Sequence, residues 1–385
     1  MSLQYISGLQ IFKDVLFRLW PVWTSLIVVM GLSFRFRDRL GLYGQLYGSG
    51  IGVAGIAIVG FWLFAAVFAH VIAPFRPLDQ IAIMREAFPG AIEPTSGKAY
   101  LLGGDSLARD VFSRVIYGSR IVLLIAPLAT LLALSVGIML GLPAGYYGRR
   151  TDSILSFIAN LVLAFPVILL FYLLVSPGVQ ETPLPFVTAG FLFLFPVVML
   201  ILLFYTRYRV RPRILIVHIL IILLVASWLY STFVFDADPL GLMRVSPSTL
   251  NIFVAVVFAS SPGKFRIVRG LAKDIKTREY VAAAQTRGES PWYIMLWEIL
   301  PNARGPLIVD TCLRVGFTTI SLGVLGYFGL GMPSESPDWG TTIKDASGLL
   351  RAYVHPGLPP AIALLSFVLG LNLLADALRE ESMRD

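Results

Sequence analysis

Long apolar runs separated by short polar stretches dominate the chain. About 18 apolar residues are enough to span a bilayer as a helix, and seven runs approach or exceed this length. They are Ile51 to Ala73, Ile121 to Leu142, Ile154 to Val175, Pro185 to Phe204, Ile214 to Phe235, Pro306 to Leu330 and Leu358 to Ala375. An eighth run, Thr249 to Ala259, is shorter and spans if Ser260 to Gly263 continue it. The pattern predicts an all-α polytopic membrane protein.

The N-terminal segment contains another apolar run, Trp20 to Phe34, flanked by basic residues on both sides. These are Lys13, Arg18, Arg35, Arg37 and Arg39. A cleaved signal peptide ends in small residues rather than in arginines, so we expect this segment to be retained. The sequence leaves open whether it lies in the membrane interface or forms an extra span.

The composition agrees with a membrane protein and excludes several other functions. The chain is 57% hydrophobic and 14% charged, too apolar for a soluble domain. Its net charge of +8 does not indicate a nucleic-acid partner, because the basic residues lie mostly in short loops between apolar runs. Cys312 is the single cysteine, which excludes a Cys-rich metal site. The sequence lacks phosphate-loop, HExxH and GxSxG motifs, so we expect no catalytic residue, metal or cofactor site in this chain.

Basic residues beside the spans predict the orientation, since short cytoplasmic loops are enriched in Lys and Arg. The most basic loop covers residues 264–305, and we place it in the cytoplasm. The resulting organisation is a cytoplasmic or interfacial segment 1–50, a first core span 51–73, an extracytoplasmic loop 74–120, a membrane core 121–378 and a cytoplasmic tail 379–385.

The cytoplasmic loop contains the stretch REYVAAAQTRGESPWYIMLWEILPNARGP, which predicts two short helices. Ala282 to Ala284 favour a helix, and Gly288 can adopt the left-handed conformation that ends one. Ser290 is a suitable N-cap and Pro291 fits the first position of a second helix. Pro301 is expected to stop that second helix.

The second predicted helix presents an apolar stripe, formed by Trp292, Met295, Leu296 and Ile299. Two interpretations of the bent pair remain open on physical grounds. It inserts into a groove on another protein, or it lies on the membrane as an ordinary amphipathic loop.

The same stretch resembles the signature loop of bacterial ATP-binding-cassette importer permeases. In that loop a Glu-Ala-Ala triplet is followed after three residues by Gly, and later by Leu-Pro; Ala282 stands here in place of the Glu. The resemblance implies an ATPase-coupling loop without the salt bridge of that Glu. Its implied contact residues are Tyr280, Ala282, Ala283, Ala284, Gly288, Ser290, Pro291, Trp292, Leu300 and Pro301.

Further stretches resemble the C-type permease of the dipeptide, oligopeptide and nickel group. They are GGDSLARDVFSRVIYGSRIVLL (103–124), GLPAGYYGRRTD (141–152), LAFP (163–166), DWG (338–340) and NLLADALRE (372–380). The resemblance implies the importer-type permease fold with six core transmembrane helices. It also implies outer loops that face a binding protein through Asp105, Arg109, Asp110, Asp338, Trp339 and Gly340.

By the same resemblance, we expect the chain to be a permease subunit of an ATP-driven importer of small peptides in the bacterial cytoplasmic membrane. The implied partners are a homologous B-type permease subunit, two cassette ATPase subunits that carry ATP and Mg, an extracytoplasmic solute-binding protein and the lipid bilayer. Nickel or another small solute is an alternative cargo. An autonomous secondary transporter or channel is an alternative of another class, which predicts buried ionisable residues in mid-span.

The stretch from about Gly178 to Ser248, with apolar runs at about 183–236, does not fit this family pattern, because members usually join the third and fourth spans by a short connection. We interpret the segment as two inserted helices, an even number that keeps the downstream orientation. Packing against lipid or a partner, or a role in the substrate path, are both open for them.

Polar residues at membrane depth are costly and therefore suggest function. Asp310 and Arg314, four residues apart, are expected to form an ion pair with a structural or gating role. Asn372 and Asp376 share one helix face and are expected to bond a neighbouring span. His218 stands alone among Ile and Leu and is expected to reach toward the interface.

Overall fold

The computed structural model describes residues 3–235, 247–330 and 336–382. Most of the stretch that links the expected inserted helices to the run at Thr249, part of the loop before Asp338, and the last three residues of the expected tail lie outside these ranges. The chain divides into two units, one of residues 1–127 and 312–385 and the other of residues 128–311. Helices α6 and α16 contribute residues to both.

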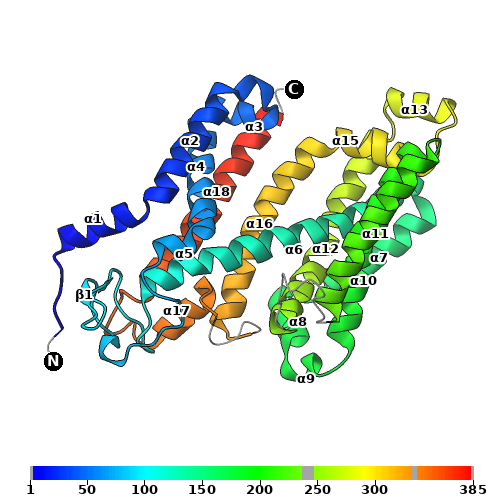
Figure 1. Cartoon of the computed structure of the whole chain (residues 1–385). Coiled ribbons are helices and arrows are strands. Elements are labelled where there is room, and N and C mark those ends of the chain that lie inside the picture. Colours follow the sequence, from blue (N-terminus) through cyan, green and yellow to red (C-terminus); the bar gives the residue numbers. More distant parts are fainter. Residues whose placement is uncertain (1–2, 236–246, 331–335, 383–385) are drawn as a thin grey trace. The chain divides into compact units, whose positions relative to one another are not determined.

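Seven helices among the described residues are long and apolar enough to cross a membrane (Figure 1). They are α4 (Gly50–Val67), α6 (Val111–Tyr147), α10 (Leu184–Tyr208), α11 (Pro212–Val234), α12 (Pro247–Ile275), α16 (Arg304–Tyr327) and α18 (Leu358–Ser382). The short run at Thr249 to Ala259 is extended as expected, since α12 passes through Pro262 to Ile275. The prediction of an all-α polytopic protein is confirmed.

The expected span at 154–175 is not one straight helix. It consists of α7 (Arg149–Leu163) and α8 (Val167–Val175), bent by 82° at the break between them. Pro166 explains the break, because proline lacks the N–H for a helical bond and disfavours helical geometry in the residue before it. With this broken pair, the described helices supply the six core spans, besides α10 and α11 as the inserted ones.

The N-terminal segment is also a bent pair. Helix α1 (Gly8–Arg18) begins at a capping box of Ser7 and Gln10, and α2 (Trp20–Arg35) follows at an angle of 51°. Helix α2 packs on α4, where the Trp23 and Phe61 rings lie 5.3 Å apart. This geometry is compatible with a broken span or with an interfacial first helix, so both interpretations stay open. Short elements η1 (Arg37–Arg39), α3 (Leu42–Gln45) and η2 (Leu46–Gly48) lead into α4.

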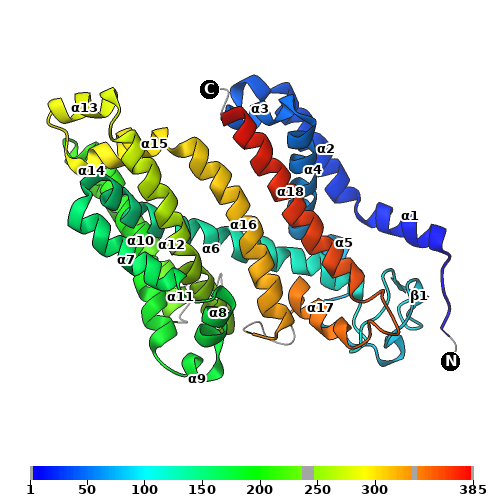
Figure 2. The same ribbon diagram turned by 180° about the vertical axis from the view of Figure 1, so that it is seen from behind.

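In the first unit, α4 and α18 lie side by side (Figure 2). A Cβ at Gly55 would lie 2.8 Å from the backbone nitrogen of Leu374, so only glycine permits this approach. The rest of the unit contains α5 (Ala69–Ile72), η3 (Ala82–Met84), the antiparallel pair β1 (Ala91–Ile92) and β2 (Ala99–Tyr100), and α17 (Trp339–Ser347).

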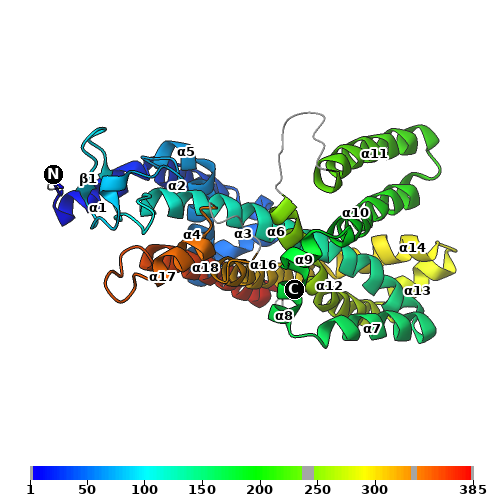
Figure 3. The same cartoon turned by 90° about the horizontal axis from the view of Figure 1, so that it is seen from below.

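In the second unit, α6 and α12 pack closely along three glycines spaced by four residues. A Cβ at Gly137, Gly141 or Gly145 would lie within 2.5–2.8 Å of a Cβ on α12. The facing residues on α12 are Lys264, Val268 and Ala272. The inserted helices α10 and α11 form a hairpin whose arms run alongside each other (Figure 3). The other elements are α9 (Pro177–Gln180), α13 (Glu279–Thr286), α14 (Pro291–Tyr293), the π-helix η4 (Ile294–Ile299) and α15 (Leu300–Asn302).

Candidate functional site

The cytoplasmic loop forms the bent helix pair that its sequence predicts. Helix α13 ends at Thr286, and Gly288 adopts a φ of 73°. A Cβ at Gly288 would meet nothing within 4 Å, so backbone conformation rather than space requires glycine here. Ser290 caps the next helix, because its Oγ accepts a hydrogen bond from the N–H of Tyr293 at 3.3 Å. Pro291 occupies the first position of α14.

Two details of the loop differ from the prediction. Helix α12 continues to Ile275, so the first residues of the predicted loop 264–305 belong to a membrane helix. Pro301 does not stop the second helix, which passes through the π-helix η4 into α15 and ends at Asn302. A π-turn is wider than an α-turn and is a common place for an irregular helical residue, which explains why proline is tolerated directly after it.

The apolar stripe of the second helix is buried within the second unit itself. Met295, Leu296 and Ile299 are at most 2% exposed and pack with Leu142 of α6 and Val268 of α12, among others. Helix α13 contributes Val281 and Ala284 to the same core. The loop is therefore a fixed part of the helical unit rather than a loose amphipathic segment.

The predicted coupling residues separate into an exposed set and a packed set. The exposed residues are Tyr280, Ala282, Ala283, Gly288, Pro291 and Pro301. The buried or half-buried ones are Ala284, Ser290, Trp292 and Leu300. Ala282 belongs to the exposed set, so the position that holds Glu in the family pattern remains on a free face of α13.

Polar contacts hold the loop to the ends of neighbouring helices. Arg287 pairs with Glu298 at 3.1 Å and thereby joins the two arms around Gly288. Gln285 donates to the hydroxyl of Tyr146 at 3.2 Å, which links α13 to the end of α6. The helix that precedes the loop is itself held in place, because Arg269 and Lys273 of α12 form ion pairs with Asp152 of α7.

A contact between the loop and the inserted helix α10 was not expected from the sequence. The indole N–H of Trp297 donates to the hydroxyl of Thr206 at 3.1 Å, and the Arg207 guanidinium lies 5.1 Å from the centre of the Trp297 ring. The two partners are 91 residues apart. A basic cluster at the end of α10 and a tryptophan outside the apolar stripe are the only local signals.

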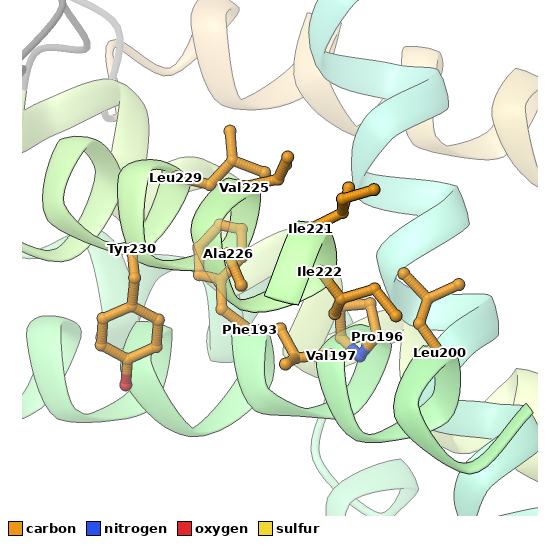
Figure 4. Close-up of a pocket in the computed structure, with 10 residues that line it drawn as sticks. All are labelled: Phe193, Pro196, Val197, Leu200, Ile221, Ile222, Val225, Ala226, Leu229 and Tyr230. Carbon is orange, nitrogen blue, oxygen red and sulfur yellow. The ribbon is translucent and has the colours of Figure 1, made fainter. Parts of the chain in front are cut away.

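The hairpin also has an open apolar pocket of about 280 Å³ between α10 and α11 (Figure 4). Its lining includes Phe193, Pro196, Leu200, Ile221 and Leu229, and Tyr230 carries the one side-chain polar atom among the lining residues.

His218 does not stand alone as expected. Its ring stacks on Phe204 of α10 at 4.5 Å, and its Nδ1 lies 2.8 Å from the carbonyl oxygen of Ile214.

A buried ion pair joins α12 and α16, two of the helices that are long and apolar enough to cross a membrane. Lys264 is 0% exposed, and its Nζ donates to Asp310 Oδ2 at 2.6 Å and to Thr311 Oγ1 at 3.2 Å. Sequence reasoning missed Lys264 because it was assigned to the basic loop. The pair of Asp310 with Arg314 stays a prediction. Asn372 and Asp376 lie on one exposed side of α18, where a bond to another span also stays a prediction.

The six residues expected to face a binding protein all lie in the first unit, and all six are buried. Arg109 is 2% exposed and bonds Asp105 and Asp345, each at 2.7 Å. Asp338 caps α17, and the adjoining Trp339 donates from its indole to the carbonyl of Val115 at 2.9 Å. Burial raises the pKa of Asp110 to about 6, although its Oδ2 accepts from the N–H of Ser113. Together with Gly340, these side chains tie segments 105–115 and 338–345 together; contact with a binding protein stays a prediction.

Comparison with known proteins agrees with these features. Residues 211–380 match the family described as binding-protein-dependent transport system inner membrane component. The match includes α11 but begins after α10, so the interpretation of both helices as an insertion is not tested by it.

Similar proteins cover most of the chain. A dipeptide transport system permease protein of Haemophilus influenzae is 28% identical over 340 residues, which cover 88% of this chain and 90% of that protein. A di/tripeptide transport system permease protein of Pseudomonas aeruginosa is 27% identical, with 85% and 86% covered. A glutathione transport system permease protein of Pectobacterium atrosepticum is 27% identical, with 73% and 71% covered. The chain thus combines membrane helices and a bent cytoplasmic loop with a similarity, over most of its length, to permease proteins of peptide transport systems.

Proposed function

We propose that this permease subunit serves an ATP-driven importer of di- and oligopeptides in the bacterial cytoplasmic membrane. The observation that carries the proposal is the bent helix pair around Gly288, with a free outer face and a buried inner stripe. Relatives over most of the chain are named for dipeptide, di/tripeptide and glutathione transport, which favours small peptides over nickel as cargo.

In this proposal ATP and Mg²⁺ bind to two separate cassette ATPase subunits, which dock on the exposed residues Tyr280, Ala282, Ala283 and Gly288. Closure of the ATPases pushes on this face. Because the inner stripe is buried against α6 and α12, the push moves these spans with the loop. Helix α16 begins two residues after α15 ends, so the motion also enters this span directly.

The remaining partners are those of an importer that takes up its solute outside the membrane and releases it inside. A homologous B-type permease subunit completes the path, and rocking of the two chains gives alternating access. A solute-binding protein docks on the extracytoplasmic side of the membrane, near segments 105–115 and 338–345. The ion pairs of Arg109 with Asp105 and Asp345 keep these segments in fixed positions for docking.

The buried Lys264–Asp310 pair favours a second candidate function. Ionisable groups at membrane depth are typical of autonomous secondary transporters, in which they carry coupling ions. The two functions differ in whether uptake needs an ATPase.

The test is uptake of labelled dipeptide into proteoliposomes. The complete complex, with both permeases, ATPases and dipeptide-loaded binding protein, is expected to accumulate peptide only with internal ATP and to hydrolyse ATP faster when the loaded binding protein is present. Uptake by this chain alone, driven by an ion gradient, would establish the secondary transporter instead.

A further inference from the structure

Helix α10 ends directly on the second helix of the coupling loop. Thr206 is 8% exposed, and its hydroxyl donates to the carbonyl of Leu202 at 2.8 Å. The hydroxyl proton is thereby used within α10. The oxygen remains free to accept the indole N–H of Trp297, which it does at 3.1 Å. Both capacities of the hydroxyl are satisfied, one inside its own helix and one toward the loop.

Two further contacts reinforce this hydrogen bond. The Arg207 guanidinium lies over the same indole ring at 5.1 Å, a distance at which a cation and an aromatic face attract each other. On the preceding turns of α10, Met199, Leu202 and Leu203 pack against the core that contains the buried stripe of the loop. The end of α10 therefore contacts both the second helix of the loop, through Trp297, and the core that buries the apolar stripe of that helix.

The position of Trp297 in the loop gives the contact its importance. It lies in the π-helix η4, between Ser290, which caps the helix, and Leu300, from which α15 leads to α16. π-Turns are often found at functional sites, and their wider hydrogen bonding makes them a natural place for a helix to change shape. A bond from the middle of this turn to a membrane helix fixes the segment that must transmit force.

We propose that Thr206, with Arg207, positions the coupling helix through Trp297, so that the inserted hairpin α10–α11 takes part in ATPase coupling rather than in the solute path. The inference rests on the proposed function and assigns the inserted helices a role in it. The pocket of the hairpin supports this division, since its lining is almost entirely apolar. Without the contact between Trp297 and the end of α10, movement of the ATPases deforms η4 and is not transmitted to the membrane helices.

The experiment compares Thr206→Val with wild type in the complete reconstituted complex, measuring peptide molecules imported per ATP hydrolysed. Valine keeps the shape of threonine but cannot accept the indole N–H. We expect the ratio to fall about fivefold or more, the lower range of typical coupling between sites, while the ATPases still copurify. Thr206→Ser keeps the hydroxyl and is expected to restore the ratio.

A matched control is Thr188→Val on the same helix, where the hydroxyl is exposed and donates to the carbonyl of Leu184 at 2.7 Å. This variant should keep the wild-type ratio. Trp297→Phe removes the same N–H from the other side and serves if Thr206→Val yields little folded complex. Its ratio should fall as well, and a double variant should lose no more than the worse single one.

A role in folding alone would lower the yield of complex and leave the ratio per ATP unchanged, which would overturn the inference. A wild-type ratio in both single variants, or failure of Thr206→Ser to restore it, would do the same. If the wild-type complex itself shows no ATP-dependent uptake, the proposed function fails, and this result is distinguishable because it does not depend on any variant.

Discussion

The ammonium of Lys264 on α12 bonds the carboxylate of Asp310 on α16 at 2.6 Å, with the lysine wholly buried. Removing one partner of a buried ion pair typically costs 3–5 kcal/mol, whereas removing both costs far less, since no uncompensated charge remains. Lys264→Met should therefore lower the thermal unfolding temperature of the detergent-purified complex strongly. Lys264→Met combined with Asp310→Asn should recover part of the loss. An additive double variant would contradict this account of the pair.

Gly288 is the hinge of the loop by virtue of its positive φ of 73°. A Cβ finds free space there, so Gly288→Ala should cost about 1 kcal/mol purely through the backbone. Gly288→Asn should cost less, because asparagine tolerates the left-handed region better. Chemical denaturation of the purified chain measures both. Equal losses for alanine and asparagine would show that conformation is not the reason for glycine.

Gly141 permits the close packing of α6 on α12, where a Cβ would lie 2.8 Å from the Cβ of Val268. Gly141→Ala should push the helices apart and destabilise the chain by about 1–3 kcal/mol, as overpacking usually does. Gly270→Ala on α12 is the matched control, since its Cβ would meet nothing within 4 Å. Alanine is the better helix former, so the control should be neutral or stabilising in the same unfolding assay.

Asp110 gives the chain a pH dependence with a defined sign. Burial raises its folded pKa to about 6, above its ordinary value of 3.8, so the protonated folded form is favoured. The stability it contributes is complete below pH 3.8 and is lost as pH rises toward 6, roughly 3 kcal/mol in all.

Asp110→Asn removes this titration but keeps a carbonyl that can accept from Ser113. The variant should unfold at a higher temperature than wild type at pH 7.5, and the advantage should shrink at pH 4.5. Asp274→Asn, at an exposed carboxylate, should change little at either pH. An unchanged pH profile in Asp110→Asn would refute the assignment.

Ala282 stands on the exposed side of α13, at the position where the family loop has glutamate. Ala282→Glu should leave stability nearly unchanged, because the side chain enters solvent. It should also strengthen copurification of the ATPases at low salt, and the gain should disappear at high salt if a new ion pair forms. Ala283→Glu, at the neighbouring exposed position of α13, tests whether position matters or only charge.

Local signals in the sequence predicted the spans and the loop well, because each depends on neighbours along the chain. The bend at Gly288 and the cap at Ser290 are of this kind. The break at Pro166 was visible to the same local rules, but the continuous apolar run 154–175 concealed it. Hydropathy reports burial in lipid and not helix direction.

Contacts between distant residues could not be predicted in this way. Trp297 with Thr206 and Lys264 with Asp310 join different helices, and nothing in their immediate sequence names the partner. Asp105 and Arg109 were expected to be exposed because they occupy a polar loop; they are buried because each neutralises the other.

The glycines of α6 and the residues that they face on α12 repeat with the same interval of four residues. At 1.5 Å per residue, the two helices can slide past each other and regain this fit only after a step of about 6 Å. Smaller displacements drive side chains into backbone. This close packing therefore disfavours sliding of α6 along α12. The two helices are expected to move together as one rigid body during transport.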